Sequence, residues 1–346
     1  MILHYIHSSD PKTGGVLEAA RNLDGELNRQ GVPSTLCFDP KELHQGVTMM
    51  VAHGLWQWPS VVAYRESLRT GTPYLVYPHG MLDPWFKKSN PIKHIKKQFY
   101  WWWRQDKILK RASAVCFTTE EEKQLAKKTF IPYRCNEVVT GLGLQDSPNE
   151  MNKQKKAFYN LHPELKGKRV LLFLGRIHPK KGVDLLLDSF SRFHEENDTL
   201  VLAGPLNDGN DSFAQKITKK SKAIGKNVYF TGMVSGDVKW GALRIADALI
   251  LPSHQENFGI VVAEALSVGT PVYLTDKVNL WREVINANAG IVSKDDAQGI
   301  DDLLRKWKGR EHLEMKANTF QCFQHNFHIR ETVMQFLDLC RGLKLI

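Results

Sequence analysis

The sequence lacks the cysteine patterns that mark a disulfide framework, a zinc ribbon or a thiol redox site. Its 5 cysteines are an odd number among 346 residues, are widely scattered, and include no CxxC pair. Cysteine used so sparingly is typical of a protein from a reducing compartment. We therefore expect a cytoplasmic location.

Long apolar stretches are also missing. The first residues, MILHYIHSSD, do not combine a basic segment with a long apolar one, so they do not predict a secretory signal. The longest apolar runs, such as VLLFL at 170–174, have the length of a strand and fall far short of a membrane span. Any association with a membrane is then expected to be peripheral, on its cytosolic face.

Positive charge, in contrast, is in excess, with a formal net charge of +10. It is concentrated at 85–111, where many Lys and Arg residues accompany a single acid, Asp106. Aromatic residues are interleaved with these bases: Trp85, Phe86, Phe99, Tyr100, Trp101, Trp102 and Trp103. Cations beside aromatic rings suit the surface of an anionic membrane. The alternative is a solvated basic helix whose aromatic side chains pack inward.

The pattern of apolar residues predicts an α/β fold with two domains, as expected for a chain of this length. Short apolar runs alternate with segments of helical period, which indicates successive βαβ units and parallel sheets. Strands are predicted at 2–8, 34–39, 48–54, 73–80, 113–119 and 137–141, then at 169–176, 199–205, 228–233, 248–253, 271–276 and 289–293. Two Rossmann-like, doubly wound sheets follow from this order.

A polar segment at 141–160 is the best candidate for a linker. It carries Pro148 and shows no apolar period before the next predicted strand, so we place the domain boundary near 144–168. The predicted domains are 1–150 and 165–325. Apolar residues at helical spacing follow the last strand and predict a closing helix in 326–346 that packs back toward the N-terminal domain.

The strongest functional signal is PSHQENFGIVVAEALSVGTP at 252–271, directly after a predicted strand. Glu256 and Glu264 are separated by seven residues, and Asn257, Phe258 and Gly259 open a helix between them. The free N–H groups of a helix start can bind a diphosphate, and Gly259 allows close approach. The two carboxylates could accept hydrogen bonds from the hydroxyls of a sugar and of a ribose.

Two carboxylates beside a diphosphate would repel it unless cations intervene. The loop GRIHPKKGVD supplies them, because Arg176 follows a predicted strand and Lys181 precedes Gly182 at the start of the next helix. Arg and Lys are the usual side chains for binding phosphates. They would stabilise the negative charge that develops on a departing diphosphate.

These segments together resemble glycosyltransferase family 4, the retaining GT-B enzymes, over the whole C-terminal half. The resemblance extends to bacterial exopolysaccharide and envelope-polysaccharide enzymes through the string HGMLDPW at 79–85. It implies two domains facing a cleft, with an acceptor-binding N-terminal domain and a donor-binding C-terminal one. It implies a catalytic set of His79, Arg176, Lys181 and Glu256. It implies a donor-binding set of Gly14, Gly15, Arg176, Lys181, Met233, Val234, Glu256, Asn257, Phe258, Gly259, Ile260 and Glu264.

In this resemblance Met233 and Val234 contact the nucleotide base, and Gly14 and Gly15 approach the donor from the other domain. His79 lies beside the reacting anomeric carbon, where it shapes and polarises the site. His53 is a second candidate at an equivalent loop and Asp83 a weaker one.

The expected reaction moves a hexose from a nucleoside-diphosphate sugar, UDP-glucose or similar, to a polysaccharide or lipid-linked oligosaccharide. No Asp-x-Asp motif occurs in a suitable loop, so we expect no required metal and no cofactor besides the donor itself. We also expect no nucleic-acid partner, and a possible contact of 85–111 with anionic membrane. A GT-B sugar-nucleotide epimerase and a basic nucleic-acid-binding protein are the alternatives.

Overall fold

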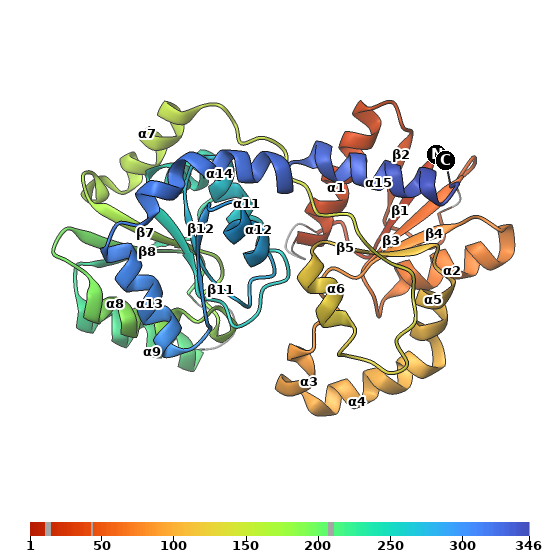
Figure 1. Ribbon diagram of the computed structural model, residues 1–346, viewed down its shortest axis with the longest axis horizontal. Helices are drawn as coiled ribbons and strands as arrows, with labels where there is room; N and C mark the ends of the chain where they lie inside the picture. The colour runs from red at the N-terminus through yellow and green to blue at the C-terminus, as the bar shows by residue number, and fades with distance from the viewer. Residues whose placement is uncertain (11–14, 43, 207–210, 346) are drawn as a thin grey trace. The chain divides into compact units, whose positions relative to one another are not determined.

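The computed structural model describes residues 1–10, 15–42, 44–206 and 211–345. The chain forms two compact units, Met1–Gln145 with Asn326–Ile346, and Asp146–His325. Each unit contains one sheet of six parallel strands with helices packed against it (Figure 1). The predicted α/β class with two doubly wound sheets is thereby confirmed.

The first unit has the strand order β2-β1-β3-β4-β5-β6. Its strands are β1 Ile2–Ile6, β2 Ser34–Cys37, β3 Met49–His53, β4 Tyr74–Tyr77, β5 Ala114–Phe117 and β6 Glu137–Val139. Its helices are α1 Gly15–Arg29, α2 Trp58–Thr70, α3 Trp85–Ser89, α4 Pro91–Tyr100, a π-helix Trp101–Gln105, α5 Asp106–Arg111, α6 Glu120–Ala126 and α15 Ile329–Gly342.

The second unit has the strand order β12-β11-β10-β7-β8-β9. Its strands are β7 Arg169–Leu174, β8 Asp198–Ala203, β9 Val228–Gly232, β10 Ala248–Leu251, β11 Val272–Thr275 and β12 Gly290–Ser293. Its helices are α7 Met151–Leu161, α8 Val183–Phe193, α9 Asp211–Ile224, α10 Gly236–Ile245, α11 Ile260–Ser267, α12 Trp281–Asn286, α13 Ala297–Lys308 and α14 His312–Asn326, with 3₁₀ turns at Pro163–Leu165 and Pro179–Lys181.

Burial explains why the strands were readable from sequence. Every residue of β4 and of β10 is buried, because helices cover both faces of a parallel sheet. Such strands read as continuous apolar runs, YLVY and ALIL in these two cases.

The predicted linker is wrong for part of its length. Residues 151–161 form α7, which packs against α10. The two helices approach closely because α10 carries Gly241, where a Cβ atom would lie 2.2 Å from the carbonyl oxygen of Gln154. Phe158 is fully buried in this contact, and one such residue is too few to produce an apolar period in the sequence.

Strand order locates the functional edge of each sheet. In the second unit the chain winds from β7 to β9 on one side and from β10 to β12 on the other, so the direction of winding reverses between β7 and β10. In the first unit it reverses between β1 and β3. Ligands of open α/β sheets bind at such reversals, beyond the carboxyl ends of the strands.

Candidate functional site

Lys181 and Glu256 meet at the reversal point of the second sheet. Lys181 follows β7 and Glu256 follows β10, and the Lys181 ammonium forms an ion pair with Oε2 of Glu256. The two side chains are 17% and 22% exposed, so solvent still reaches the pair. A cation and an acceptor carboxylate, predicted from separate loops, therefore lie together.

Close backbone contact brings the two loops into this position. The N–H group of His254 donates to the carbonyl oxygen of Lys180 at 2.9 Å. Gly182, with φ of 66°, lies against the residue that follows β10, and a Cβ atom there would be 2.1 Å from the carbonyl oxygen of Pro252. Only glycine fits, because both the backbone conformation and the space exclude a side chain.

Helix α11 starts where the sequence predicted it. Gly259 is its N-terminal cap, with φ of 75°, and Ile260 is its first residue. Phe258 is buried, whereas Asn257 and Ile260 are half-buried. The start of this helix thus follows Glu256 directly and leaves backbone N–H groups available for an anion.

Glu264 is buried on α11 and forms its ion pair with a lysine that sequence reasoning missed. Lys239, in α10, places its Nζ 2.5 Å from Oε1 of Glu264. The carboxylate is thus balanced by a cation although only 7% of the residue is exposed. The available signal was a lysine in the helix that begins just after Met233 and Val234.

The remaining predicted donor residues are more exposed. Arg176 lies on the surface after β7. Met233 is 81% exposed and Val234 is half-buried, both in the loop between β9 and α10. Surface positions of this kind are accessible to a nucleotide.

Three histidines of the first unit form a hydrogen-bonded row. His79 Nε2 lies 3.0 Å from Nδ1 of His53, and His53 Nε2 lies 3.0 Å from Nδ1 of His4. They come from β1, from the end of β3 and from the loop after β4, and their rings stack with centroids 5.3 Å apart. The sequence named His79 and His53 but missed His4, which is hidden inside an apolar strand.

Burial keeps this row uncharged. It lowers the pKa of His4 to about 3 and that of His79 to about 4, and it holds the pKa of His53 well below its usual value. Each ring therefore carries one proton at neutral pH. His4 Nε2 is buried and has no hydrogen-bond partner among the residues that the structure describes.

The unpartnered atom orders the protons of the row. A buried lone pair is tolerated more readily than a buried N–H group without an acceptor. The favoured arrangement therefore has Nδ1–H of His4 donating to His53, and Nδ1–H of His53 donating to His79. His79 is left with a proton on its other nitrogen, Nδ1, and can offer it to a substrate oxygen.

The loop that carries His79 is fixed from α6. Glu122 is buried, and its Oε1 accepts a hydrogen bond of 2.5 Å from the N–H group of Gly80. His79 itself has a positive φ of 50°, unusual for a residue with a side chain. Asp83 is buried and accepts from the N–H group of Trp85, so it shapes the same loop.

The predicted glycine pair is only partly visible. Gly14 lies outside the described residues. Gly15 is the exposed first residue of α1.

Family comparison assigns both halves of the chain. A model described as "Glycosyl transferases group 1" matches residues 154–320, and one described as "Glycosyl transferase 4-like domain" matches residues 43–140. The chain belongs to the family 4-like GT-B glycosyltransferases. The resemblance inferred from the Glu256 and Glu264 motif is thereby confirmed.

Curated relatives of this family match chiefly over part of their length. An uncharacterized glycosyltransferase of Methanocaldococcus jannaschii is 29% identical over 48% of this chain and 44% of its own. The mannosylfructose-phosphate synthase of Agrobacterium fabrum is 30% identical over 41% of this chain and 31% of its own. A D-inositol 3-phosphate glycosyltransferase of Frankia alni is 25% identical over 82% of this chain and 75% of its own.

Solved structures share the fold over nearly the whole chain. Anabaena HepE in complex with UDP and glucose has a TM-score of 0.74 at 16% identity, covering 99% of both chains. The sucrose-phosphate synthase of Thermosynechococcus elongatus has a TM-score of 0.74 at 17% identity, covering 99% of this chain and 98% of the other. At these identities the likeness concerns the GT-B fold alone.

The basic segment 85–111 presents apolar side chains on its outer face. Ile92, Ile95, Phe99, Trp102 and Trp103 are between 53% and 71% exposed. Their spacing of three or four residues places them along one side of α4 and the π-helix. We call these five residues the apolar stripe.

The inner face of the same segment packs on the domain. Trp101 is fully buried and stacks on Phe130 at 4.9 Å, and Nε1 of Trp101 donates to the carbonyl oxygen of Pro132. Trp101 therefore packs inward, as the second interpretation of this segment predicted. Phe99, Trp102 and Trp103 are exposed instead. Among the described residues, no helix is long and apolar enough to cross a bilayer.

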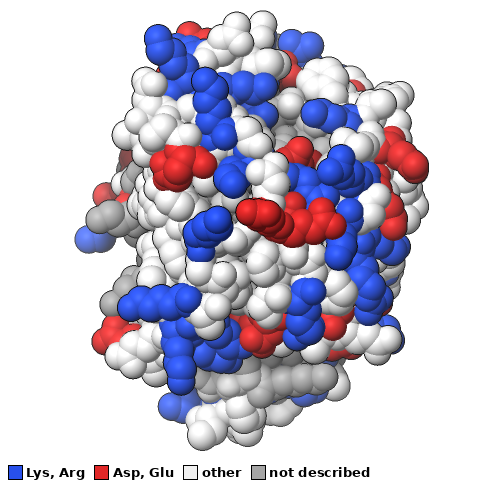
Figure 2. Space-filling view, turned by 90° about the vertical axis from the view of Figure 1, so that its left-hand side faces the viewer, with Lys and Arg blue, Asp and Glu red and all other residues white. Residues whose placement is uncertain are grey.

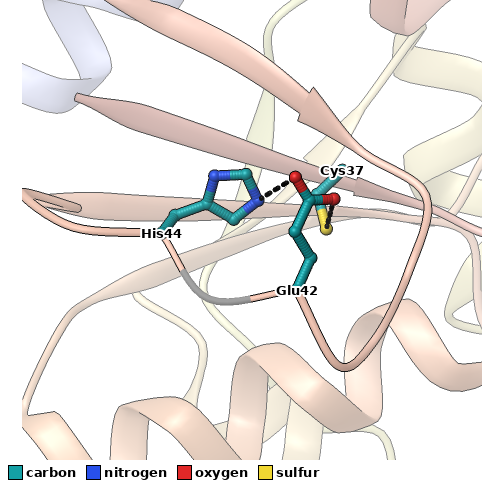
Figure 3. A group of neighbouring side chains, drawn as sticks. All are labelled: Cys37, Glu42 and His44. Carbon is teal, nitrogen blue, oxygen red and sulfur yellow. Dashed lines mark hydrogen bonds and ion pairs between the residues drawn. The ribbon is translucent and has the colours of Figure 1, made fainter.

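One group of side chains in the described part of the chain has the composition of a metal site, namely Cys37, Glu42 and His44 (Figure 3). Its geometry is that of a hydrogen-bonded cluster. The Cys37 thiol lies 3.1 Å from the carbonyl oxygen of Asp39 and 3.8 Å from Glu42, and burial with the nearby acids raises its pKa. A protonated thiol is a poor metal ligand.

Charge on the second unit is mixed in sign. On the face drawn in Figure 2, Lys and Arg side chains are interspersed with Asp and Glu, so no continuous basic surface covers that face. The positive field expected of a nucleic-acid-binding surface is therefore missing from this side of the molecule.

Proposed function

We propose that this protein is a retaining transferase that moves a hexose from a nucleoside-diphosphate sugar to a polysaccharide or lipid-linked oligosaccharide. UDP-glucose or a similar donor fits best, since the structural neighbour HepE was crystallised with UDP-glucose. The observation that carries the proposal is the meeting of Lys181 and Glu256 at the reversal point of the second sheet. The start of α11 follows directly and adds N–H donors for a diphosphate.

In this proposal, different residues of the site contact different parts of the donor. Lys181 and Arg176 hold the diphosphate, Glu256 accepts hydrogen bonds from the sugar hydroxyls, and Glu264 accepts them from the ribose. Met233 and Val234 contact the base. Lys239 orients Glu264, because the ion pair at 2.5 Å offsets the cost of burying that carboxylate.

Transfer with retention requires no protein nucleophile in this proposal. The acceptor hydroxyl attacks the anomeric carbon from the face that the diphosphate leaves, the C–O bond to phosphate breaks, and the departing phosphate oxygen takes the hydroxyl proton. Lys181 and Arg176 lower the barrier by stabilising the charge on that leaving group. His79 assists as a hydrogen-bond donor through Nδ1–H.

The test is a donor panel with UDP, GDP and ADP sugars, each with and without a membrane extract as acceptor. We expect acceptor-dependent release of one nucleoside diphosphate and a product with the anomeric configuration of the donor, read by NMR coupling constants. Activity should be unchanged by EDTA. Interconversion of donor sugars without an acceptor would favour an epimerase, and an inverted product would refute the mechanism.

We further propose that the apolar stripe docks the protein on an anionic membrane. Three aromatic rings among exposed lysines match the interfacial environment, where rings lie at headgroup depth and cations face anionic lipid. Replacing Phe99, Trp102 and Trp103 together with Ser should reduce sedimentation with anionic vesicles by about tenfold or more. Salt-sensitive binding to single-stranded DNA, with no binding to vesicles, would contradict this proposal.

A further inference from the structure

A cavity in the first unit lies between the loop after β4 and helix α4. Its volume is about 350 Å³, within the usual range for a small-molecule site. Met81, Trp85 and Phe130 form its apolar wall. None of the catalytic or donor-binding residues proposed above lines it.

Basic side chains outnumber acidic ones around this cavity. Lys93, His94 and Lys97 line it from one side of α4, and neither lysine forms an ion pair within the described part of the chain. The ammonium of Lys97 lies 4.6 Å from the centre of the Trp56 ring, and the ring of His94 stacks on Phe130 at 4.8 Å. Packing thus holds these groups beside the opening.

Burial and mutual repulsion both lower the pKa values of these groups. Burial lowers the pKa of Lys97, and the charge of Lys93 lowers it further. Burial also lowers the pKa of His94, with Lys87 and Lys97 adding to the effect. Among the described residues that line the cavity, Asp83 is the one acid, and its Oδ1 already accepts a hydrogen bond of 2.7 Å from the backbone of Trp85. An anion bound here would relieve the repulsion between the lysines.

We infer that this cavity binds a phosphate group carried by a lipid, between Lys93 and Lys97 of α4 and the wall formed by Met81, Trp85 and Phe130. The lipid source follows from the apolar stripe, because Ile92 and Ile95 of the same helix turn are 71% and 56% exposed beside the lysines. A helix lying in the membrane surface would bring its own lysines to headgroup depth. The inference deepens the proposed transfer to a lipid-linked acceptor and rests on it for its biological meaning.

The position of the cavity suits an acceptor. Part of its wall belongs to the loop that carries His79. Asp83 is four positions after His79, so their backbones are at most about 14 Å apart. A lipid phosphate in the cavity would leave the attached sugar near His79. The first sugar of a lipid-linked acceptor would thereby be held by its phosphate end.

The test is vesicle binding by the full-length protein, with no donor and no turnover. Phosphatidylcholine vesicles contain either phosphatidic acid or phosphatidylserine, adjusted to equal surface potential. We expect about tenfold preference for phosphatidic acid, the effect of one or two charge-assisted hydrogen bonds. The Lys93→Gln/Lys97→Gln variant should lose this preference. The matched control Lys96→Gln/Lys107→Gln, which removes two exposed charges, should weaken binding to both vesicles and keep the preference.

Several outcomes would overturn the inference. One such outcome is equal binding of the wild type to both vesicles. Another is a preference for phosphatidic acid that the Lys93→Gln/Lys97→Gln variant retains with unchanged thermal unfolding. Either result would mean that the protein binds anionic vesicles by general electrostatic attraction and not through the cavity. Inorganic phosphate titrated without vesicles should bind at least about tenfold more weakly than the lipid phosphate. Equal affinity would mean that the cavity takes a free phosphate. Because no donor is present, loss of the proposed transferase activity would leave this result unaffected.

Discussion

At the scale of single residues, the candidate site of the second unit is built from paired charges. Lys181 has Glu256 as a partner, and Lys239 has Glu264. A bound diphosphate would compete with Glu256 for the Lys181 ammonium and release that carboxylate toward the sugar hydroxyls. The ion pair therefore stores both groups in position before the donor arrives, which reduces the reorganisation needed on binding.

Replacing Lys181 or Glu256 with Ala should lower turnover by about 100-fold or more, because each change removes a contact to charge or hydroxyls in the transition state. The measurement is kcat with the donor identified in the panel above. Lys219→Ala, which removes an exposed lysine of α9, is the control and should leave turnover unchanged. Near-normal turnover in both site variants would refute the proposed roles.

The histidine row predicts a specific tautomer for each ring. His4, His53 and His79 should all carry their proton on Nδ1, which is measurable from imidazole nitrogen and carbon shifts in NMR. His4→Asn keeps a donor near the Nδ1 position and should preserve the pattern, whereas His4→Leu removes it and should let His53 populate the other tautomer. Protonation of His79 on Nε2 in the wild type would contradict the proposed order.

The same row makes stability depend on pH. The folded pKa of His4 is about 3, below the value of about 6.5 in the unfolded chain, so the unfolded state binds more protons as the pH falls. Stability is then complete above pH 6.5 and is lost toward acid. His4 alone should cost about 2 kcal/mol at pH 5. Denaturant unfolding between pH 7.5 and 4.5 measures this, and His4→Gln should flatten the curve.

At the scale of elements, the sequence predicted the strands because a parallel sheet buries its strands on both faces. The runs YLVY and ALIL are apolar without interruption, so their type and place were evident. The sequence did not predict helix α7, because this helix buries little besides Phe158. It packs closely on α10 because α10 carries Gly241 at the contact. No apolar period arises from a contact of that kind.

The site followed the same division. Glu256 and Glu264 lie in a spaced motif and Lys181 lies in the loop after β7, so the sequence could propose all three as site residues. Lys239 and Glu122 act through ion pairs and hydrogen bonds to residues distant in sequence, and only the fold reveals those partners.

Two glycine variants should separate the effect of the close contact between the Lys181 loop and the Glu256 loop from the effect of backbone strain. Gly182→Ala introduces a side chain at φ of 66° with a Cβ atom 2.1 Å from Pro252, whereas Gly225→Ala has φ of 85° and open space. Gly225→Ala should lose about 1 kcal/mol of stability from backbone strain alone, and Gly182→Ala should lose more because the clash with Pro252 adds to the strain. Gly182→Ala alone should weaken donor binding, by about tenfold or more, because it displaces Lys181 from Glu256. Equal donor affinity in both variants, measured by calorimetry, would contradict this account.

At the scale of the whole molecule, the first unit is discontinuous in sequence. Helix α15 packs beside α1, and its residues Ile329, Val333, Phe336, Leu337 and Cys340 share one buried cluster with β1, β3, β4 and β5 (Figure 1). Leu144 also pairs with His328 as an isolated bridge. The first unit therefore depends on residues that come after the entire second unit.

Separate expression should expose this dependence. Losing five buried apolar side chains removes about 10 kcal/mol, which equals the whole stability of a typical domain. Fragment 1–145 should therefore remain unfolded, and fragment 146–325 should fold alone with cooperative thermal unfolding. Amide exchange of both fragments measures this, and native-like protection in fragment 1–145 would refute the expected role of α15.

The discontinuity fixes an order of events on the ribosome. The sheet of the first unit is translated first, but α15, which covers one of its apolar faces, is translated last. That face therefore stays uncovered while roughly half of the protein is still being synthesised. The later-made sheet completes itself before the earlier one can. Nascent chains of this protein should consequently expose apolar surface for an unusually long interval, which makes them candidates for chaperone binding during synthesis.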